Sequence, residues 1–420
     1  MKVYPTAEKI EKIKTACQEL LTKSSPKIRE VVSMLGFLTS VFPAALYGPL
    51  HFRELDMDKT EALKLNKGNF EKPMCLSDKA CSELSWWINS ADSLHKPISN
   101  TLPEITLFTD ASNHGWGAVL NNCPIGGKWT PLEANNHINY LEMLAVFLAL
   151  TAFHSQLSGK HVCVRIDNMT AVADIGKMGT SHSRKRNALT RNIWDWCVQH
   201  NVFLTTAHIA GKDNTIADAE SRKSRKDLEW SLNTNIFENG IGQLGVKPTI
   251  DLFASRLNYK IKPFISYQPD PEAEIINAFT VSWQPYLFYA FPPFSLITLV
   301  LQKIQEEHST GVIVVPQWPK QPWWPVLMRM IVQQPLILPR TKQTLLLPTN
   351  PDLLHPLHQK LTLLMCHLSG DPSKIKAFHA KLCPSSCHPG DKARNSNTSR
   401  MSVSGSSTVV AGKLITFQLL

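Results

Sequence analysis

The first part of the chain carries apolar residues at helical spacing. Ile28, Val31, Leu35 and Leu38 follow one another at intervals of three or four residues. This period places them on one face of an α-helix, with polar residues on the other face. The pattern predicts a helical packing segment over residues 1–98, without a catalytic signature of its own.

From residue 100 to residue 228 the spacing of apolar residues changes: apolar and polar residues alternate with period two, and helical stretches interrupt this alternation. The alternation favours strands in EITLFTD, GWGAVL, GGKWT, HVCVRID and VFLTTAHIAG, because alternate side chains of a strand point to opposite faces. The run INYLEMLAVFLALTAF and the segment near 183–200 favour helices, and a last helix opens at Asn214. This order predicts an α/β domain over 100–228, with a mixed five-stranded sheet covered by helices.

A second α/β pattern covers residues 245–350. TIDLF, LFYAF and TGVIVV favour strands, and SLITLVLQKIQEE between the last two favours a helix. These segments predict a small sheet with a strand–helix–strand unit. Residues 351–420 are expected to form a helical turn and then a flexible linker, because residues 370–411 are rich in Ser, Pro, Asn, Lys and Gly.

Composition narrows the kinds of partner. The formal net charge is +10 and the sequence pI is about 9.1, which favours a polyanion such as nucleic acid. No apolar run reaches the roughly 18 residues that a membrane-spanning helix needs, and the chain opens with an amphipathic pattern rather than a signal peptide. The nine cysteines show no regular framework and are expected to be reduced thiols. We therefore expect an intracellular protein, in the nucleus or the cytoplasm, without a membrane partner; its oligomeric state is left open.

Four acidic residues stand at places where they can converge. Asp110 and Asp167 end predicted strands, Glu142 lies early in the long helix, and Asp218 lies in the first turns of the last helix. Strand ends and helix starts meet at one edge of such a sheet. Hydrolysis of a phosphodiester needs an activated water and neutralised oxygens, which two divalent ions provide together. Because Mg²⁺ prefers carboxylate oxygens, the four acids form a candidate site for two Mg²⁺ ions, with Mn²⁺ as a substitute.

A single acid at a strand end is usually only solvated, so the signal lies in the combination. The four acids occur within TDAS, NYLEMLA, RIDN and HIAGKDNTIADAESR, in that order. Packed together without metal they would repel one another, and at least one carboxyl pKa should rise. His208 lies ten residues before Asp218 and is a candidate for accepting or relaying a proton. The alternative for His208 is a structural role.

These segments resemble the ribonuclease H domain of retroelement polyproteins. The resemblance covers residues 100–228, and HIAGKDNTIADAESR is similar to the closing motif of gypsy-type and related elements. It implies a ribonuclease H-like fold in which the four acids bind two Mg²⁺ ions and His208 assists. It also implies an activity, the hydrolysis of the RNA strand of RNA–DNA hybrids. Glu220 departs from the pattern, because related elements usually have an apolar residue there.

Contacts with the substrate are expected beside the acids. Ribonuclease H distinguishes RNA from DNA through 2′-hydroxyl groups in the minor groove, and Ser112, Asn113 and Asn168 are candidates for these contacts. Each of them is equally well explained as a turn residue. A basic stretch at the predicted helix near 183–200 is a candidate for gripping the DNA backbone, or else a solvated face. Its candidate residues are Arg184, Lys185 and Arg186.

The flanks resemble parts of DIRS-type, tyrosine-recombinase retroelements. REVVSMLGFLTSVFPAALYGPLHFR and ELSWWIN resemble the reverse-transcriptase thumb and connection region that precedes ribonuclease H. IDLFASRLN and YAFPPFSLI resemble the methyltransferase-like domain that follows it, but Phe291 stands where active adenine methyltransferases have Asp or Asn. The chain has no Asp-Asp pair of the kind that a polymerase palm needs, and its tail CHPGDKARNSNTSR resembles the linker before a recombinase. Polymerase and methyltransferase activities are therefore not expected.

The sequence leads to one main hypothesis and two alternatives. The main hypothesis is a metal-dependent endonuclease for RNA–DNA hybrids, in a truncated retroelement polyprotein that lacks the polymerase palm and the recombinase. The first alternative is a non-catalytic, nucleic-acid-binding remnant. The second is an integrase-like or resolvase-like nuclease on the same fold, whose substrate would be duplex DNA.

Overall fold

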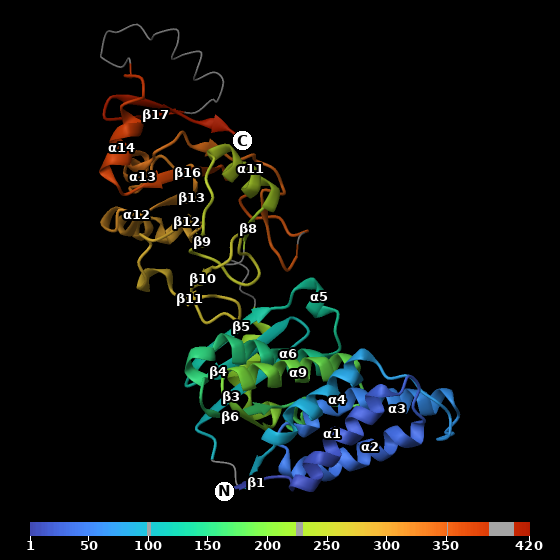
Figure 1. Ribbon diagram of the computed structural model, residues 1–420. Helices are drawn as coiled ribbons and strands as arrows, with labels where there is room; N and C mark the ends of the chain where they lie inside the picture. The colour runs from blue at the N-terminus through green and yellow to red at the C-terminus, as the bar shows by residue number, and fades with distance from the viewer. Residues whose placement is uncertain (99–101, 224–229, 351, 386–406) are drawn as a thin grey trace. The chain divides into compact units, whose positions relative to one another are not determined.

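The chain folds as two compact units, Met1–Lys223 and Ser224–Leu420 (Figure 1). The computed structural model describes residues 1–98, 102–223, 230–350, 352–385 and 407–420. Within these ranges, none of the helices has the length and apolar character needed to cross a membrane. Each unit has its own sheet and its own apolar core, so the two are described separately.

A mixed five-stranded sheet organises the second half of the first unit. Its strand order is β5-β4-β3-β6-β7; β3 and β5 run antiparallel to β4, while β3, β6 and β7 run parallel. The strands are β3 Ile105–Ala111, β4 Gly115–Leu120, β5 Cys123–Lys128, β6 His161–Ile166 and β7 Phe203–His208. The predicted five-stranded sheet is thus confirmed. The two ends of the predicted domain, residues 100–101 and 224–228, lie outside the described ranges.

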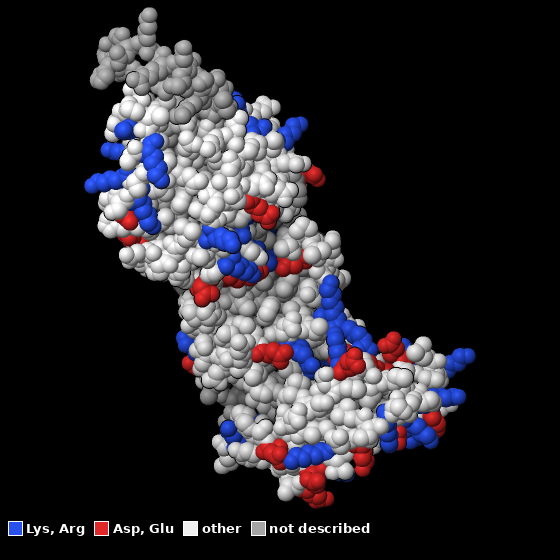
Figure 2. All heavy atoms as spheres, turned by 45° about the horizontal axis from the view of Figure 1, so that its top comes forward, with Lys and Arg blue, Asp and Glu red and all other residues white. Residues whose placement is uncertain are grey.

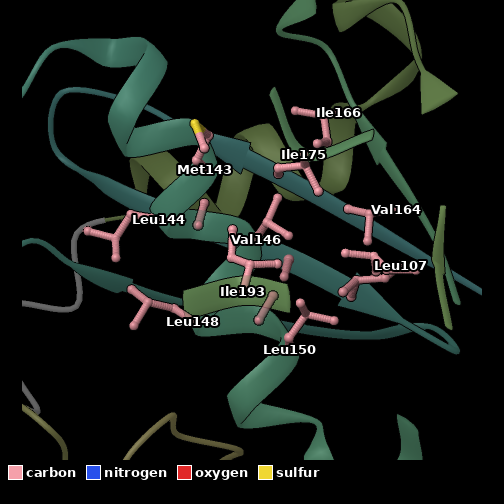
Figure 3. Close-up of a cluster of buried hydrophobic side chains, with 14 of the residues drawn as sticks. Leu107, Met143, Leu144, Val146, Leu148, Leu150, Val164, Ile166, Ile175 and Ile193 are labelled. Atoms are coloured by element: carbon pink, nitrogen blue, oxygen red, sulfur yellow. The ribbon is translucent and has the colours of Figure 1, made fainter. Parts of the chain in front are cut away.

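One apolar core lies between this sheet and its long helices. Leu107 and Val164 of the sheet belong to the same cluster as Val146 and Leu150 of α6 and Ile193 of α9 (Figure 3). All five are fully buried, and burial of one such side chain contributes about 1.5–3 kcal/mol. The helices of this region are α5 Pro131–Ala134, α6 Ile138–Ala152, α7 His154–Leu157, α8 Met169–Gly176, α9 Arg184–Gln199 and α10 Thr215–Arg222.

Helix α10 packs on the sheet through a residue that has no side chain. Trp116 of β4 belongs to the core with α6, so its neighbour Gly117 faces the opposite side of the sheet. A Cβ atom at Gly117 would lie 2.1 Å from the carbonyl oxygen of Ala217 and 2.6 Å from the backbone nitrogen of Ser221. Glycine therefore allows the close approach of α10, the helix that carries Asp218.

The residues before this sheet form a helical bundle with its own apolar core. Ion pairs join the bundle to α9: Arg184 lies 2.8 Å from both Glu54 and Asp58, and Arg191 lies 3.4 Å from Glu83. These three carboxylates are buried, and a buried carboxylate is strongly destabilising unless it is paired. The bundle and α9 therefore depend on each other. The helices are α1 Ala7–Thr22, α2 Ile28–Val41, α3 Arg53–Leu65 and α4 Asp78–Ser90.

The second unit is built on a six-stranded sheet in the order β19-β14-β16-β13-β12-β9. β9, β12 and β13 are parallel, and the helix α12 connects β12 to β13. These four elements coincide with the predicted strands TIDLF, LFYAF and TGVIVV and the helix between the last two. Their bounds are β9 Ile250–Asp251, β12 Leu287–Ala290, α12 Ile297–Glu306 and β13 Thr310–Pro316, followed by β14 Leu336–Ile337, β16 Leu363–Ser369 and β19 Gln418–Leu419.

This sheet extends beyond the predicted end of the domain at residue 350. β16 pairs antiparallel with β13 along its whole length, from Ser369 opposite Thr310 to Leu363 opposite Pro316. The prediction of a helical turn and a linker over 351–420 is therefore wrong for β16, because a short apolar run does not distinguish strand from helix until a partner strand is known. Residues 386–406, where much of the expected linker falls, lie outside the described ranges. The described part after β16 contains α14 Pro372–His379, β17 Ser407–Val410 and β18 Lys413–Thr416.

Short elements complete both units. In the first unit, two strands pair antiparallel; in the second unit, one short pair is parallel, another is antiparallel, and two further helices occur. They are β1 Lys2–Val3, β2 Lys96–Pro97, β8 Ser231–Leu232, β10 Ile265–Ser266, β11 Ile275–Ile276, β15 Leu345–Leu346, α11 Thr234–Leu244 and α13 Trp324–Met330.

The close packing of Gly117 against α10 yields a test of the fold. The substitution Gly117→Ala should push α10 away from β4 and lower the free energy of opening of α10 by about 1–3 kcal/mol. Hydrogen–deuterium exchange of peptides covering residues 213–223 measures this opening. The control is Gly36→Ala, an exposed helical glycine with nothing within 4 Å of the added Cβ, which should leave α10 unchanged. Equal protection of α10 in wild type and Gly117→Ala would contradict this packing.

Candidate active site

Three of the four predicted acids converge at one edge of the first sheet. Asp110 lies near the end of β3, Asp167 follows the last residue of β6, and Glu142 lies in the second turn of α6. One carboxylate oxygen from each lies within 4.8 Å of the others. β3 and β6 are adjacent and parallel, so their carboxyl ends meet at the same edge. This arrangement is the convergence that the strand and helix pattern predicts.

The inner oxygens of this group have no hydrogen-bond donor. Asp110 is 3% exposed and Glu142 is 4% exposed. Among the described residues, Oδ2 of Asp110 and Oε2 of Glu142 are buried without any hydrogen-bond partner. A buried polar atom without a partner is destabilising by about 1–3 kcal/mol or more for a charged group. Clustered, unpartnered carboxylate oxygens fit a hard divalent cation such as Mg²⁺, so the residues present fit the expected metal.

The pKa values reflect the same crowding. Burial, together with the charges of Asp110 and Asp167, raises the pKa of Glu142 to about 9. Burial and the charges of Asp167 and Asp218 raise the pKa of Asp110 to about 6. The pKa of Asp167 is raised as well, by burial and then by Asp218. Carboxyl groups with raised pKa values in a polar cluster are typical of functional sites, and the rise is the one expected for acids packed without metal.

The fourth acid, Asp218, lies beside the group of three and is paired with a cation. Its Oδ1 accepts a hydrogen bond from Nε of Arg222 at 2.8 Å and makes an ion pair with the same guanidinium at 2.7 Å. Its side chain is 40% exposed, in contrast to Asp110 and Glu142. Asp218 still contributes to the raised pKa of Asp110 and Asp167. The structure therefore brings all four acids to one edge, where Asp110 and Glu142 are buried and Asp167 and Asp218 are partly exposed.

His208 lies at the same edge, as its place in the sequence predicts. It is the last residue of β7 and is exposed. Its charge lowers the pKa of Asp167, which places the imidazole near that carboxylate. An exposed imidazole beside the acidic group can exchange protons with solvent. Its part in proton transfer stays a prediction.

Two of the three candidates for RNA contacts form the local structure around the acids. The Ser112 hydroxyl accepts the backbone N–H groups of His114 at 3.1 Å and Gly115 at 3.2 Å, and donates to the carbonyl oxygen of Ser221 at 2.8 Å. It thereby ties the β3–β4 turn to α10. Asn168 is the N-cap of α8. Asn113 is exposed in the turn after β3, and the contacts of all three with substrate stay predictions.

The basic stretch on α9 is largely engaged within the first unit. Arg184 forms ion pairs with acids of α3, and Nε of Arg186 lies 3.3 Å from Asp174. The ammonium group of Lys185 lies 5.0 Å from the centre of the Tyr140 ring. On the face shown in Figure 2, basic and acidic side chains are interspersed over the helical bundle at lower right rather than gathered in one basic patch. Binding of DNA by these three residues stays a prediction.

The sequence did not single out Asn214 as a residue that positions the site. Asn214 is buried, and its Nδ2 donates to the carbonyl oxygen of Thr109 at 2.9 Å. This bond joins the start of α10 to β3 directly beside Asp110. The available signal was the place of Asn214 at the opening of the last helix, four residues before Asp218, but its partner could not be read from the sequence.

Comparison with known proteins gives a family match over part of the first unit. Residues 102–192 match the family model described as the RNase H-like domain found in reverse transcriptase. This match contains Asp110, Glu142 and Asp167 and ends before His208 and Asp218. The enzymatic polyprotein of Carnation etched ring virus is 29% identical over 143 residues, which are 31% of this chain and 20% of that protein. The retrovirus-related Pol polyprotein from transposon 412 of Drosophila melanogaster is 27% identical over 135 residues, which are 30% of this chain and 10% of that protein.

The similarity of this chain to solved structures is weaker than its similarity to the two polyproteins. RNase H1 from Halobacterium salinarum NRC-1 has 16% sequence identity and a TM-score of 0.24, over 28% of this chain and 92% of that one. The foamy viral protease-reverse transcriptase in complex with RNA/DNA hybrid has 11% identity and a TM-score of 0.20, over 54% of this chain and 31% of that one. Scores of this size carry no structural argument, so the assignment rests on the strand order and the family match.

The strand order β5-β4-β3-β6-β7 and the family match together define an RNase H-like domain within the first unit. The domain is of the kind that occurs in reverse transcriptases and in the polyproteins of retroelements. The chain spans only one fifth and one tenth of the two polyproteins that it matches.

The raised pKa of Glu142 predicts how stability depends on pH in the metal-free protein. The folded state keeps a proton on Glu142 that the unfolded state loses above its ordinary value of 4.5. The stability linked to this group is therefore fully present below pH 4.5 and is lost as the pH rises towards about 9, with a limiting slope of about 1.4 kcal/mol per pH unit.

Calorimetric melting of wild type and Glu142→Gln in EDTA, from pH 5 to pH 9, tests this dependence. The melting temperature of the first unit should fall with pH in the wild type and fall much less in Glu142→Gln. The control Glu8→Gln changes an exposed acid of α1 and should follow the wild type. A wild type and a Glu142→Gln variant with the same pH dependence would show that this carboxyl is not held protonated.

Proposed function

We propose that the chain is a metal-dependent endonuclease that hydrolyses the RNA strand of RNA–DNA hybrids. The observation that carries the proposal is the group of Asp110, Glu142 and Asp167, with two buried oxygens that have no donor among the described residues. It lies at the edge of an RNase H-like sheet, which is where the sequence predicts the catalytic acids.

Asp110, Glu142 and Asp167 would bind a divalent cation, Mg²⁺ or in its place Mn²⁺, and Asp218 beside them supports the proposal of a second ion. Bound divalent ions activate the attacking water and neutralise charge on the phosphate and the leaving oxygen. The carboxylates must be ionised to bind a cation, so binding releases the proton that the raised pKa of Glu142 retains. The protein supplies the fixed positions of these oxygens, which a packed sheet edge and the core helix α6 provide.

The remaining residues orient the site and exchange protons. His208 at the exposed end of β7 would accept or deliver a proton as water attacks or product leaves. Arg222 neutralises Asp218, and Asn214 fixes the start of α10 against β3. Ser112, Asn113 and Asn168 would contact the RNA strand, and Arg184, Lys185 and Arg186 the DNA strand. The net charge of +10 supports a nucleic-acid substrate.

We further propose that the chain belongs to a DIRS-type retroelement polyprotein. In this proposal residues 1–98 are the thumb and connection segment, and the second unit contains the methyltransferase-like domain predicted over 245–350. Phe291 follows β12 at the place where an adenine methyltransferase needs a hydrogen-bonding side chain, and its ring lies 6.4 Å from that of Phe294. A phenyl ring accepts no such hydrogen bond, so methylation is not expected.

The first experiment compares substrates and metals. Purified full-length chain with Mg²⁺ should cleave the RNA strand of a labelled RNA–DNA hybrid and leave single-stranded RNA and duplex DNA intact. EDTA should stop cleavage, and Mn²⁺ should restore it. Binding of the hybrid without cleavage, across metals and salt concentrations, would favour the non-catalytic remnant instead, and cleavage of duplex DNA would favour an integrase-like or resolvase-like nuclease.

The second experiment removes one charge from the acidic group. Asp110→Asn should lower the cleavage rate by about 10³-fold or more, because the group loses a ligand of the metal. It should also abolish the rise in melting temperature that Mg²⁺ produces in the wild type by binding the folded state. Asp92→Asn is the matched control, since the Asp92 side chain is 73% exposed and pairs with Lys14 on the surface. Normal cleavage by folded Asp110→Asn would overturn the proposed mechanism.

A further inference from the structure

A small cavity in the second unit lies outside everything used for the proposed function. It is lined by Arg340, Lys342, His355 and His358, by Thr341 and Thr344, and by three leucines. From its geometry and charge we propose that this cavity binds a phosphate group. The proposal concerns a different unit of the chain and does not depend on the ribonuclease activity.

The first wall of the cavity is a compact turn before β15. The backbone N–H of Thr341 donates to Oγ1 of Thr344 at 3.1 Å, and the N–H of Thr344 donates to the carbonyl oxygen of Thr341 at 3.3 Å. Thr344 is buried, whereas Arg340 and Lys342 are exposed. These two bonds flank Lys342, with Arg340 immediately before them, and both cationic side chains are exposed to solvent.

The second wall contains two histidines, and the hydrogen bonds of their Nδ1 atoms show which ring nitrogen donates and which accepts. Nδ1 of His355 accepts the backbone N–H of Leu357 at 3.1 Å, so the proton of the neutral ring lies on Nε2. Nδ1 of His358 lies 2.9 Å from the carbonyl oxygen of His355, and since a carbonyl only accepts, this nitrogen donates. Burial and then the neighbouring His358 lower the pKa of His355, which keeps His355 neutral. Its Nε2–H is thus a donor that is not used by these bonds.

The charge around the cavity has one sign. No Asp or Glu is among the residues that line it. Between residues 340 and 361 the one acidic residue is Asp352, which is exposed and does not line the cavity. Within the described ranges, neither Arg340 nor Lys342 forms an ion pair. Two free cations and a fixed N–H donor around a concave site without carboxylates are the features that attract an anion.

The size of the cavity selects a small ligand. The space inside it is only about 20 Å³, which is room for about one water molecule, so a ligand larger than water lies at its open mouth. A single phosphate group at this mouth, held by an arginine fork and a lysine, matches the charge. The group can belong to free inorganic phosphate or to the backbone of a nucleic acid strand that passes the open mouth.

The first arm of the test uses inorganic phosphate alone. Isothermal titration of full-length chain with phosphate should detect binding, and Arg340→Gln/Lys342→Gln should weaken it by about 10-fold or more, the effect expected when one or two charge-assisted hydrogen bonds are removed. Lys247→Gln/Lys320→Gln is the matched control, because it removes two exposed lysines of the same unit that do not line the cavity. Lys342→Gln alone serves as a second variant with a smaller expected effect.

The second arm uses nucleic acid in an Asp110→Asn background, so that cleavage does not interfere. Anisotropy of a labelled RNA–DNA hybrid and of duplex DNA is measured against salt concentration. If the phosphate comes from a backbone, the slope of log K against log salt should become shallower in Arg340→Gln/Lys342→Gln, by about 0.9 for each backbone phosphate that the variant no longer neutralises. The slope should stay unchanged in the control.

The outcomes separate the two sources and can overturn the proposal. Weaker phosphate binding together with a shallower salt slope assigns the site to a nucleic acid backbone, whereas weaker phosphate binding alone assigns it to free phosphate. If phosphate does not bind the wild type and the slope does not change, or if the control variant is weakened as much as Arg340→Gln/Lys342→Gln, the proposal is wrong. Hybrid cleavage is measured separately, so failure of the ribonuclease proposal leaves this result unaffected.

Discussion

The crowding of buried negative charge at one sheet edge is the constraint on which the first unit depends. Asp110 and Glu142 are almost fully shielded from solvent, and each has an inner oxygen without a donor among the described residues. Such a pair opposes folding when both groups are ionised, which is why their pKa values are raised. A rigid support must hold them together, and the core shared by the sheet, α6 and α9 provides it. A divalent cation would convert this repulsion into binding energy.

The same unit shows how a buried carboxylate with a structural role differs from one in a candidate site. Glu54 and Asp58 are buried like Asp110, but Arg184 lies within 2.8 Å of both. Their charge is neutralised inside the protein, and they join the helical bundle to α9. Asp251 of the second unit accepts backbone N–H groups of Lys260 and Phe253 and likewise organises its own loop. Burial alone therefore does not distinguish a candidate site; an unpartnered buried oxygen with a second acid nearby is what distinguishes Asp110 and Glu142.

The two units use charge in opposite ways. The candidate active site gathers acids that need a cation, while the cavity beside Arg340 gathers cations and donors that need an anion. In both sites hydrogen bonds hold the backbone in place: parallel strands do so in the first unit, and turns do so in the second. A backbone fixed in this way reduces the conformational freedom that is lost on binding.

The sequence by itself determined the five-stranded sheet, the helices around it and the identity of the clustered acids, because hydrophobic period fixes the type of element and strand ends share one edge. It could not show that Asp218 is paired with Arg222, that Arg184 faces Glu54, or that Asn214 bonds to Thr109, since each of these interactions joins groups whose directions depend on packing. It also missed β16, because a seven-residue apolar run becomes a strand only when β13 lies beside it. The local sequence pattern thus determined which residues are candidates for binding a metal or a substrate. Tertiary packing decided which of these side chains are available, because only the folded chain shows which charges are already neutralised.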